Sequence, residues 1–208
     1  MTQPGASQVP PSARLGAALR ELLDLVVTTD ADNELLERST KAVLMMTADF
    51  AAAEKAVVDP LELTQFRRQT SLVGGAAHPF GPQLSFESTA DGSVGYVTLG
   101  PVYEGGPGLV HGGILALLLD HAMGHAAVSE DIGAMTTELI LRYKRPTPLG
   151  RPLRVRASLD RTSGRLLTLS ADITVDDVLT VQASATFLTL THANVMSIFG
   201  GDRLASQP

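Results

Sequence analysis

The feature that most constrains the fold is an apolar segment near the middle of the chain, within residues 109–130. Residues 113–128 are predicted to form a helix, and almost no polar residue gives this helix a polar face. A surface helix normally keeps one polar side, so a helix that is apolar all round is expected to be buried on most sides. His111 just before it and Asp120 within it therefore need either a partner or a function.

The segments around this helix alternate between apolar and polar residues, which predicts strands with one buried face. Two strands are expected before the helix, at 84–88 and 94–99, joined by the hairpin signal Asp91-Gly92. Four more are expected after it, near 136–143, 153–160, 167–175 and 179–187, in hairpin connection. The sequence therefore predicts an α+β fold in which an antiparallel sheet of five to six strands wraps around one long central helix.

The N-terminal part has a different pattern, with apolar residues at helical spacing over about 12–26 and 35–55. We predict a disordered N-terminus (1–11), a helical hairpin extension (12–59), a main domain (60–192) and a weakly structured tail (193–208). Acidic residues outnumber basic ones in the hairpin, which argues against a role in DNA binding. A packing or oligomer-forming extension is the simpler interpretation.

Composition excludes several classes of protein. The 208 residues include no Cys, so disulfides, thiolate chemistry and Cys-based metal sites are ruled out. The net charge of −6 argues against nucleic acid and anionic membranes as partners. The first residues carry no secretory signal, and no apolar run is long enough to span a membrane. A cytoplasmic protein is expected.

The residues EGGPGLVHGG, followed by Asp120 nine positions after His111, resemble the hotdog-fold thioesterases. The closest resemblance is to the phenylacetate-pathway, PaaI-like branch of the 4-hydroxybenzoyl-CoA thioesterase superfamily, and the later segments MTTEL and YKRP fit the same branch. It covers roughly residues 80–192 and not the N-terminal hairpin. The resemblance implies a hotdog fold, hydrolysis of an acyl-CoA thioester to the free acid and CoA, and no cofactor.

The resemblance also implies roles for individual residues. It places the catalytic carboxylate at Asp120, as general base or nucleophile, and a water-orienting hydroxyl at Thr136. The oxyanion-binding backbone N–H falls in the His111-Gly112-Gly113 turn, at Gly113, and Gly112 is placed among the substrate-binding residues. Independently, a helix start offers unpaired N–H groups, and glycines let a substrate oxygen approach them closely. His111 is expected to position the turn rather than to transfer a proton.

Structural interpretations stand beside these roles. Asp120 could be a structurally satisfied carboxylate, and a one-residue error in the strand would exchange Thr136 for Thr137. His121 and His125 have the i, i+4 spacing of a metal pair, but the sequence offers no obvious third ligand. No metal site is predicted.

Helix geometry suggests that two chains are needed. Gly113 and Asp120 are seven residues apart, about 10 Å along one helix. They cannot reach the same thioester carbon, whereas two antiparallel copies bring the turn of one chain to Asp120 of the other. A homodimer with two composite sites is expected, and assembly of dimers into a tetramer is left open.

A CoA substrate also calls for cations near its phosphates. Eight of the 16 Lys and Arg residues lie between positions 142 and 165, and Arg142, Lys144 and Arg145 are the predicted contacts. Two other functions remain open. One is a hotdog enoyl-CoA hydratase or dehydratase, and the other is a non-catalytic acyl-CoA-binding sensor.

Overall fold

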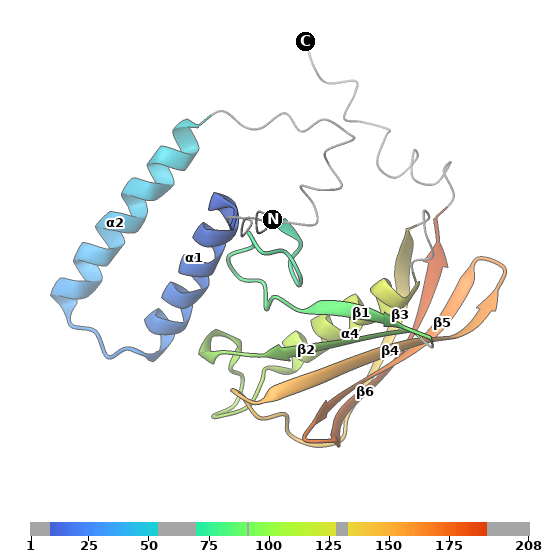
Figure 1. Cartoon of the computed structure of the whole chain (residues 1–208). Coiled ribbons are helices and arrows are strands. Elements are labelled where there is room, and N and C mark those ends of the chain that lie inside the picture. The colour runs from blue at the N-terminus through green and yellow to red at the C-terminus, as the bar shows by residue number, and fades with distance from the viewer. Residues whose placement is uncertain (1–8, 54–69, 91, 128–132, 191–208) are drawn as a thin grey trace, which may run out of the picture. The chain divides into compact units, whose positions relative to one another are not determined.

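The computed structural model describes residues 9–53, 70–90, 92–127 and 133–190 (Figure 1). The chain divides into two compact units, Met1–Gly81 and Pro82–Pro208. Residues 1–8, Asp91 of the predicted hairpin turn, and the tail from residue 193 lie outside the described residues. The predicted domain boundaries stay predictions.

The first unit contains the two expected helices, α1 (Pro11–Thr28) and α2 (Asn33–Ala52). Asp32 caps α2, its carboxylate accepting a hydrogen bond of 2.8 Å from the Leu35 N–H. Arg20 anchors α1 to the segment that follows α2, because its guanidinium donates to the backbone carbonyls of Ala76 (3.2 Å) and His78 (2.7 Å). No residue of α2 is buried, so its apolar stripe is not used as a core.

The second unit is built on one six-stranded antiparallel sheet. Its strands are β1 (Ser85–Thr89), β2 (Gly92–Thr98), β3 (Ala134–Tyr143), β4 (Pro152–Ser163), β5 (Leu166–Val175) and β6 (Val178–Thr189). A short 3-10 helix, η1 (Pro101–Tyr103), leads to α4 (Gly112–Ala127), which lies across the sheet (Figure 1). The α+β prediction, with its strand count and central helix, is confirmed.

The prediction that the last four strands are all joined as hairpins is wrong for β3. The strand order is β1-β2-β4-β5-β6-β3, so β3 pairs with β6 and forms an edge of the sheet. The β3–β4 connection carries Pro146 and Pro148, which cannot donate to a ladder. It passes the start of α4 instead, where the Val110 N–H donates to Thr147 and the Leu149 N–H donates to Gly108, both at 2.9 Å.

One face of α4 forms the core with the sheet. Leu118, Leu119, Ala122 and Met123 have no exposed surface. The opposite face, which includes Leu117, is only partly covered. The helix was expected to be buried on most sides, and in the single chain it is fully buried only on the side that faces the sheet. The reason is geometric, because a single curved sheet covers only the side of the helix that faces it. Within the described residues, no helix has the length and apolar character needed to cross a membrane.

Candidate active site

The glycine-rich turn before α4 is held by hydrogen bonds from both sides. The Glu104 carboxylate accepts from the Gly108 N–H at 2.5 Å, and the Gly105 N–H donates to the Leu109 carbonyl at 2.9 Å. Gly108 has φ +71°, a conformation that glycine adopts without strain. Together with the bonds from the β3–β4 connection, these contacts fix the position of the helix start.

His111 caps α4. Its Nδ1 accepts a hydrogen bond of 3.0 Å from the Gly113 N–H, while its carbonyl accepts from Ile114 at 2.9 Å. The Gly113 N–H, predicted to hold the oxyanion, is thus engaged within the chain. For the Gly112 N–H, no acceptor is found among the described residues, as expected for the first residue of a helix. The Tyr143 hydroxyl donates to the Gly112 carbonyl at 2.9 Å and holds this residue in place.

Loss of the cap is expected to affect stability. His111→Ala should lower the free energy of unfolding by about 1 kcal/mol, the usual cost of removing an N-cap acceptor. His111→Asn should retain most of it, because Asn is itself a favourable N-cap residue. Urea denaturation followed by circular dichroism measures both. Equal losses in the two variants would show that the capping bond is not what His111 contributes.

Asp120 and Thr136 lie together on the open side of α4. The Thr136 hydroxyl donates to the Asp120 carboxylate at 2.7 Å, which joins the helix to the edge strand β3. The neighbouring Thr137 hydroxyl instead donates to the Thr186 carbonyl at 2.9 Å. An irregularity in the β3–β6 pairing between Thr136 and Glu138 accompanies this difference. Of the two threonines, Thr136 is therefore the one that reaches Asp120.

A cleft of ≈350 Å³ surrounds this pair, and its lining also includes His121, His125 and Phe187. The Phe86 ring from β1 lies 5.9 Å from the His121 ring and 5.2 Å from the His125 ring, between ring centroids. Burial, followed by the neighbouring His125, lowers the pKa of His121, and the Asp120 carboxylate only partly offsets these effects. His121 is therefore a neutral imidazole at pH 7, next to a carboxylate.

A second cleft, of ≈430 Å³, lies at the start of α4. It is lined by Gly112, Tyr143, Lys144 and Arg145 among others, and Asp120 does not line it. One chain therefore carries two separate clefts along the same helix. One has a carboxylate and a hydroxyl, and the other has a free backbone N–H and cations.

The thioesterase superfamily model matches residues 107–182, which include α4, Thr136 and the cations at the helix start. A crystal structure of a thioesterase superfamily protein is 31% identical, covers 90% of this chain and 94% of its own, and superposes with a TM-score of 0.75. The chain belongs to the thioesterase superfamily. The hotdog fold and the superfamily predicted from the HGG turn and Asp120 are thereby confirmed.

Curated relatives of this thioesterase-superfamily member are named for an activity. Acyl-coenzyme A thioesterase THEM4 of Xenopus laevis is 37% identical over 93 residues, which are 44% of this chain and 42% of that protein. The mouse protein of the same name is 40% identical over 85 residues, 41% of this chain and 36% of its own. The chain thus matches less than half the length of these relatives. The PaaI protein of E. coli shares the fold, with 19% identity and a TM-score of 0.50 over 53% of this chain and 81% of its own.

The basic residues of this superfamily member are distributed over two faces of the sheet. Arg142 lies opposite Gln182, in the same row as Asp172 and Arg156, whereas its neighbour Tyr143 reaches α4. Arg142 therefore lies on the face of the sheet away from the helix, apart from Lys144 and Arg145. Arg151 forms an ion pair with Asp176 at 2.5 Å. Of the three predicted contacts to CoA, the structure brings only Lys144 and Arg145 to the start of α4.

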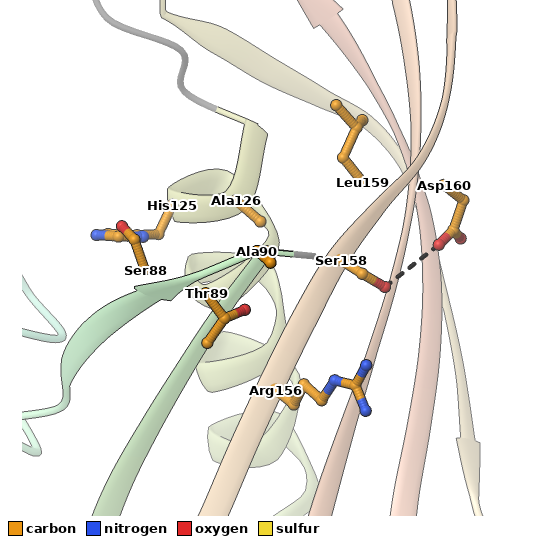
Figure 2. A pocket seen from close by; sticks show the side chains of 10 residues that line it. Ser88, Thr89, Ala90, His125, Ala126, Arg156, Ser158, Leu159 and Asp160 are labelled. Atoms are coloured by element: carbon orange, nitrogen blue, oxygen red, sulfur yellow. Dashed lines mark hydrogen bonds between the residues drawn. The ribbon is translucent and has the colours of Figure 1, made fainter.

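A larger hollow of ≈680 Å³ lies beside the tip of the β1–β2 hairpin (Figure 2). The Asp160 carboxylate in its lining accepts hydrogen bonds from Ser158 at 3.3 Å and from the neighbouring Ser170 at 2.9 Å. It shares His125 with the Asp120 cleft but does not contain Asp120. In the described part of the chain, no group of three His, Cys, Asp or Glu residues is arranged to hold a metal ion. The two clefts along α4 remain the candidate active site.

Two contributors to the site, Tyr143 and Phe86, are not predicted from the sequence, and Gly112 is predicted only to bind substrate. Tyr143 was noted only as part of the YKRP segment, because its contact with Gly112 joins residues 31 positions apart. Phe86 comes from the opposite edge of the sheet, and no local pattern indicates its contact with the two histidines. The N–H of Gly112, and not that of Gly113, is free because the His111 side chain accepts from Gly113. The two glycines are adjacent in the same turn, so the sequence offers both as candidates for the oxyanion donor.

Proposed function

We propose that this protein is an acyl-CoA thioesterase that hydrolyses an acyl-CoA thioester to the free acid and CoA. The observation that carries the proposal is the Thr136–Asp120 hydrogen bond, which holds a carboxylate on the open face of α4 beside a cleft. The family membership and the activity for which the THEM4 relatives are named support it. Homogeneous protein should release CoA from acyl-CoA esters, and because the chain has no Cys, a thiol-detecting reagent reports CoA alone.

In the proposed reaction, Asp120 acts as general base. Its carboxylate removes a proton from a water molecule whose oxygen attacks the thioester carbonyl carbon. The carbonyl oxygen becomes an oxyanion that the free N–H of Gly112 stabilises, helped by the partial positive charge of the helix start. When the C–S bond breaks, the CoA thiolate leaves and receives the proton held by Asp120. Direct attack by Asp120 to give an anhydride is the alternative, and the same residues would serve it.

The oxyanion donor comes from a second copy of the chain in this proposal. Gly112 and Asp120 are eight residues apart on one helix, about 12 Å along its axis, so they cannot serve the same carbonyl. In an antiparallel pair of α4 helices, Gly112 of the partner subunit faces Asp120, and the two-fold axis passes near Ala116 and Leu117. The half-exposed side of α4 and the unpaired edge of β3 are the surfaces that such a homodimer would cover.

The phosphates of CoA are assigned to Lys144 and Arg145. Both lie in the cleft at the start of α4, next to the N–H of Gly112. The Arg145 guanidinium also donates to the Leu179 carbonyl at 3.0 Å, which fixes its direction. These cations would draw the phosphates of a CoA ester to the same end of α4 as the oxyanion donor.

Thr136 is a positioning residue in this scheme, because it acts through Asp120. Thr136→Val is expected to lower kcat by about 10- to 100-fold, the value of a hydrogen bond to a charged group, with KM little changed. Thr136→Ser should restore most of the loss, since it retains the hydroxyl. Thr137→Val, at the neighbouring position, is the matched control and should keep kcat. A loss in KM alone, or no rescue by Ser, would contradict the assignment.

Two other functions are outcomes of the same assays. Hydration of crotonyl-CoA without release of CoA would indicate a hydratase. Binding of acyl-CoA esters with neither reaction would indicate a sensor. Membership of the thioesterase superfamily favours hydrolysis over both.

A further inference from the structure

The open face of α4 contains a glycine one helical turn beyond the catalytic carboxylate. Gly124 follows Asp120 by four residues, so both lie on the same side of the helix. A glycine in a helix interior costs about 1 kcal/mol relative to alanine. Gly124 is not among the residues with positive φ, so its backbone conformation does not require glycine. The absence of a side chain at this position is therefore what needs an explanation.

The space above Gly124 is open. A Cβ placed there would approach only the Phe187 ring, at 3.9 Å, which is an ordinary contact distance. Phe187 is only 2% exposed, so its ring forms a fixed apolar floor. Another small residue, Ala134 at the start of β3, also lines this cleft, together with Asp120 and Thr136. The cleft thus extends from the carboxylate over Gly124, away from the start of α4.

We propose that Gly124, Ala134 and Phe187 form the subsite for the acyl chain. This inference rests on the proposed thioesterase function. Among the described residues, the lining of the Asp120 cleft contains no Lys or Arg, whereas the cations that suit CoA phosphates line the cleft at the helix start, so the Asp120 cleft is assigned to the acyl half of the substrate. The floor of the subsite is apolar, and the titratable groups in its lining besides Asp120 are the imidazoles of His121 and His125.

The position of Gly124 gives an expected chain length. Four helical residues span about 6 Å. An extended peptide advances about 3.5 Å per residue, which contains three backbone bonds. An extended acyl chain is therefore expected to advance about 1.2 Å per bond. An acyl chain whose carbonyl carbon lies at Asp120 therefore passes Gly124 at about its fifth or sixth carbon. The subsite fits straight aliphatic acyl groups of medium length, and a side chain at position 124 would obstruct them.

The experiment compares kcat/KM for acetyl-, butyryl-, hexanoyl- and octanoyl-CoA. In the wild type, octanoyl-CoA should be hydrolysed with a higher kcat/KM than acetyl-CoA. Gly124→Val should lower kcat/KM for octanoyl-CoA by about 10-fold or more, and that for acetyl-CoA by no more than about twofold, because lost space for a few methylenes has effects of this size. Gly124→Ala should give a smaller shift in the same direction.

Ala126→Val is the matched control, since Ala126 lies on the same helix but lines the other hollow (Figure 2). It should leave the chain-length profile unchanged. Ala134→Val narrows the subsite from the opposite wall and should reproduce the shift, which keeps the test valid if Gly124→Val does not fold. An active wild type whose Gly124 and Ala134 variants lose activity equally on all chain lengths would overturn the subsite. A wild type that hydrolyses none of the four esters would instead overturn the proposed function.

Discussion

Replacing Asp120 by asparagine is expected to reduce kcat by about 10²- to 10⁴-fold, the range that a positioned general base contributes. Asparagine has the same shape, and its amide oxygen can still accept the 2.7 Å hydrogen bond from Thr136. The variant loses only the ability to take a proton or to attack carbon, so KM should change little. Steady-state release of CoA from the best acyl-CoA ester measures both constants.

The control for this substitution is Asp160→Asn, a second carboxylate held by hydroxyl donors. Asp160 accepts from Ser158 and Ser170 but lies in the larger hollow, so its variant should keep kcat. Thermal unfolding of both variants tests whether the fold is intact. The loss expected for a general base is at least about 10²-fold. A kcat for Asp120→Asn within about threefold of the wild-type value would therefore exclude Asp120 from the mechanism.

The sequence predicted the second unit well wherever short-range periodicity determines structure. The alternation along β4, β5 and β6 predicted the buried face of each strand, and the turns at Gly164 and Asp176-Asp177 adopt the positive φ values typical of tight turns. The resemblance carried by the HGG turn and Asp120 gave the superfamily. These signals are local, so a single sequence is sufficient to read them.

What the sequence did not predict depends on contacts between distant segments. The position of β3 at the sheet edge follows from its pairing with β6, about 40 to 55 residues away along the chain. The alternation of apolar and polar residues along a strand does not tell which strands are its neighbours in the sheet. The orientation of the His111 side chain determines which glycine N–H is free. Arg142 and Tyr143 are adjacent in sequence but lie on opposite faces of β3, so a count of basic residues could not separate them.

Mixing two inactive variants should restore activity if the site is shared between subunits. Gly112→Pro removes the free N–H, and proline is well tolerated at the first position of a helix. In a heterodimer with an Asp120→Asn chain, one of the two composite sites has both groups intact and the other has neither. The purified heterodimer should therefore show about half of the wild-type kcat, while each variant alone remains nearly inactive.

Gly112→Ala separates the loss of the N–H from a steric effect. A Cβ at residue 112 would lie 3.2 Å from the Tyr143 hydroxyl, so alanine and proline both press on this side chain, but alanine retains the N–H. We expect Gly112→Ala to keep most of its kcat and Gly112→Pro to lose about 10²- to 10³-fold, as when one oxyanion donor is removed. If the groups instead served one site within a single chain, neither chain of the heterodimer would have a complete site. Confirmed heterodimers without activity would therefore reject the shared site, while leaving the role of Asp120 to be judged by its own variant.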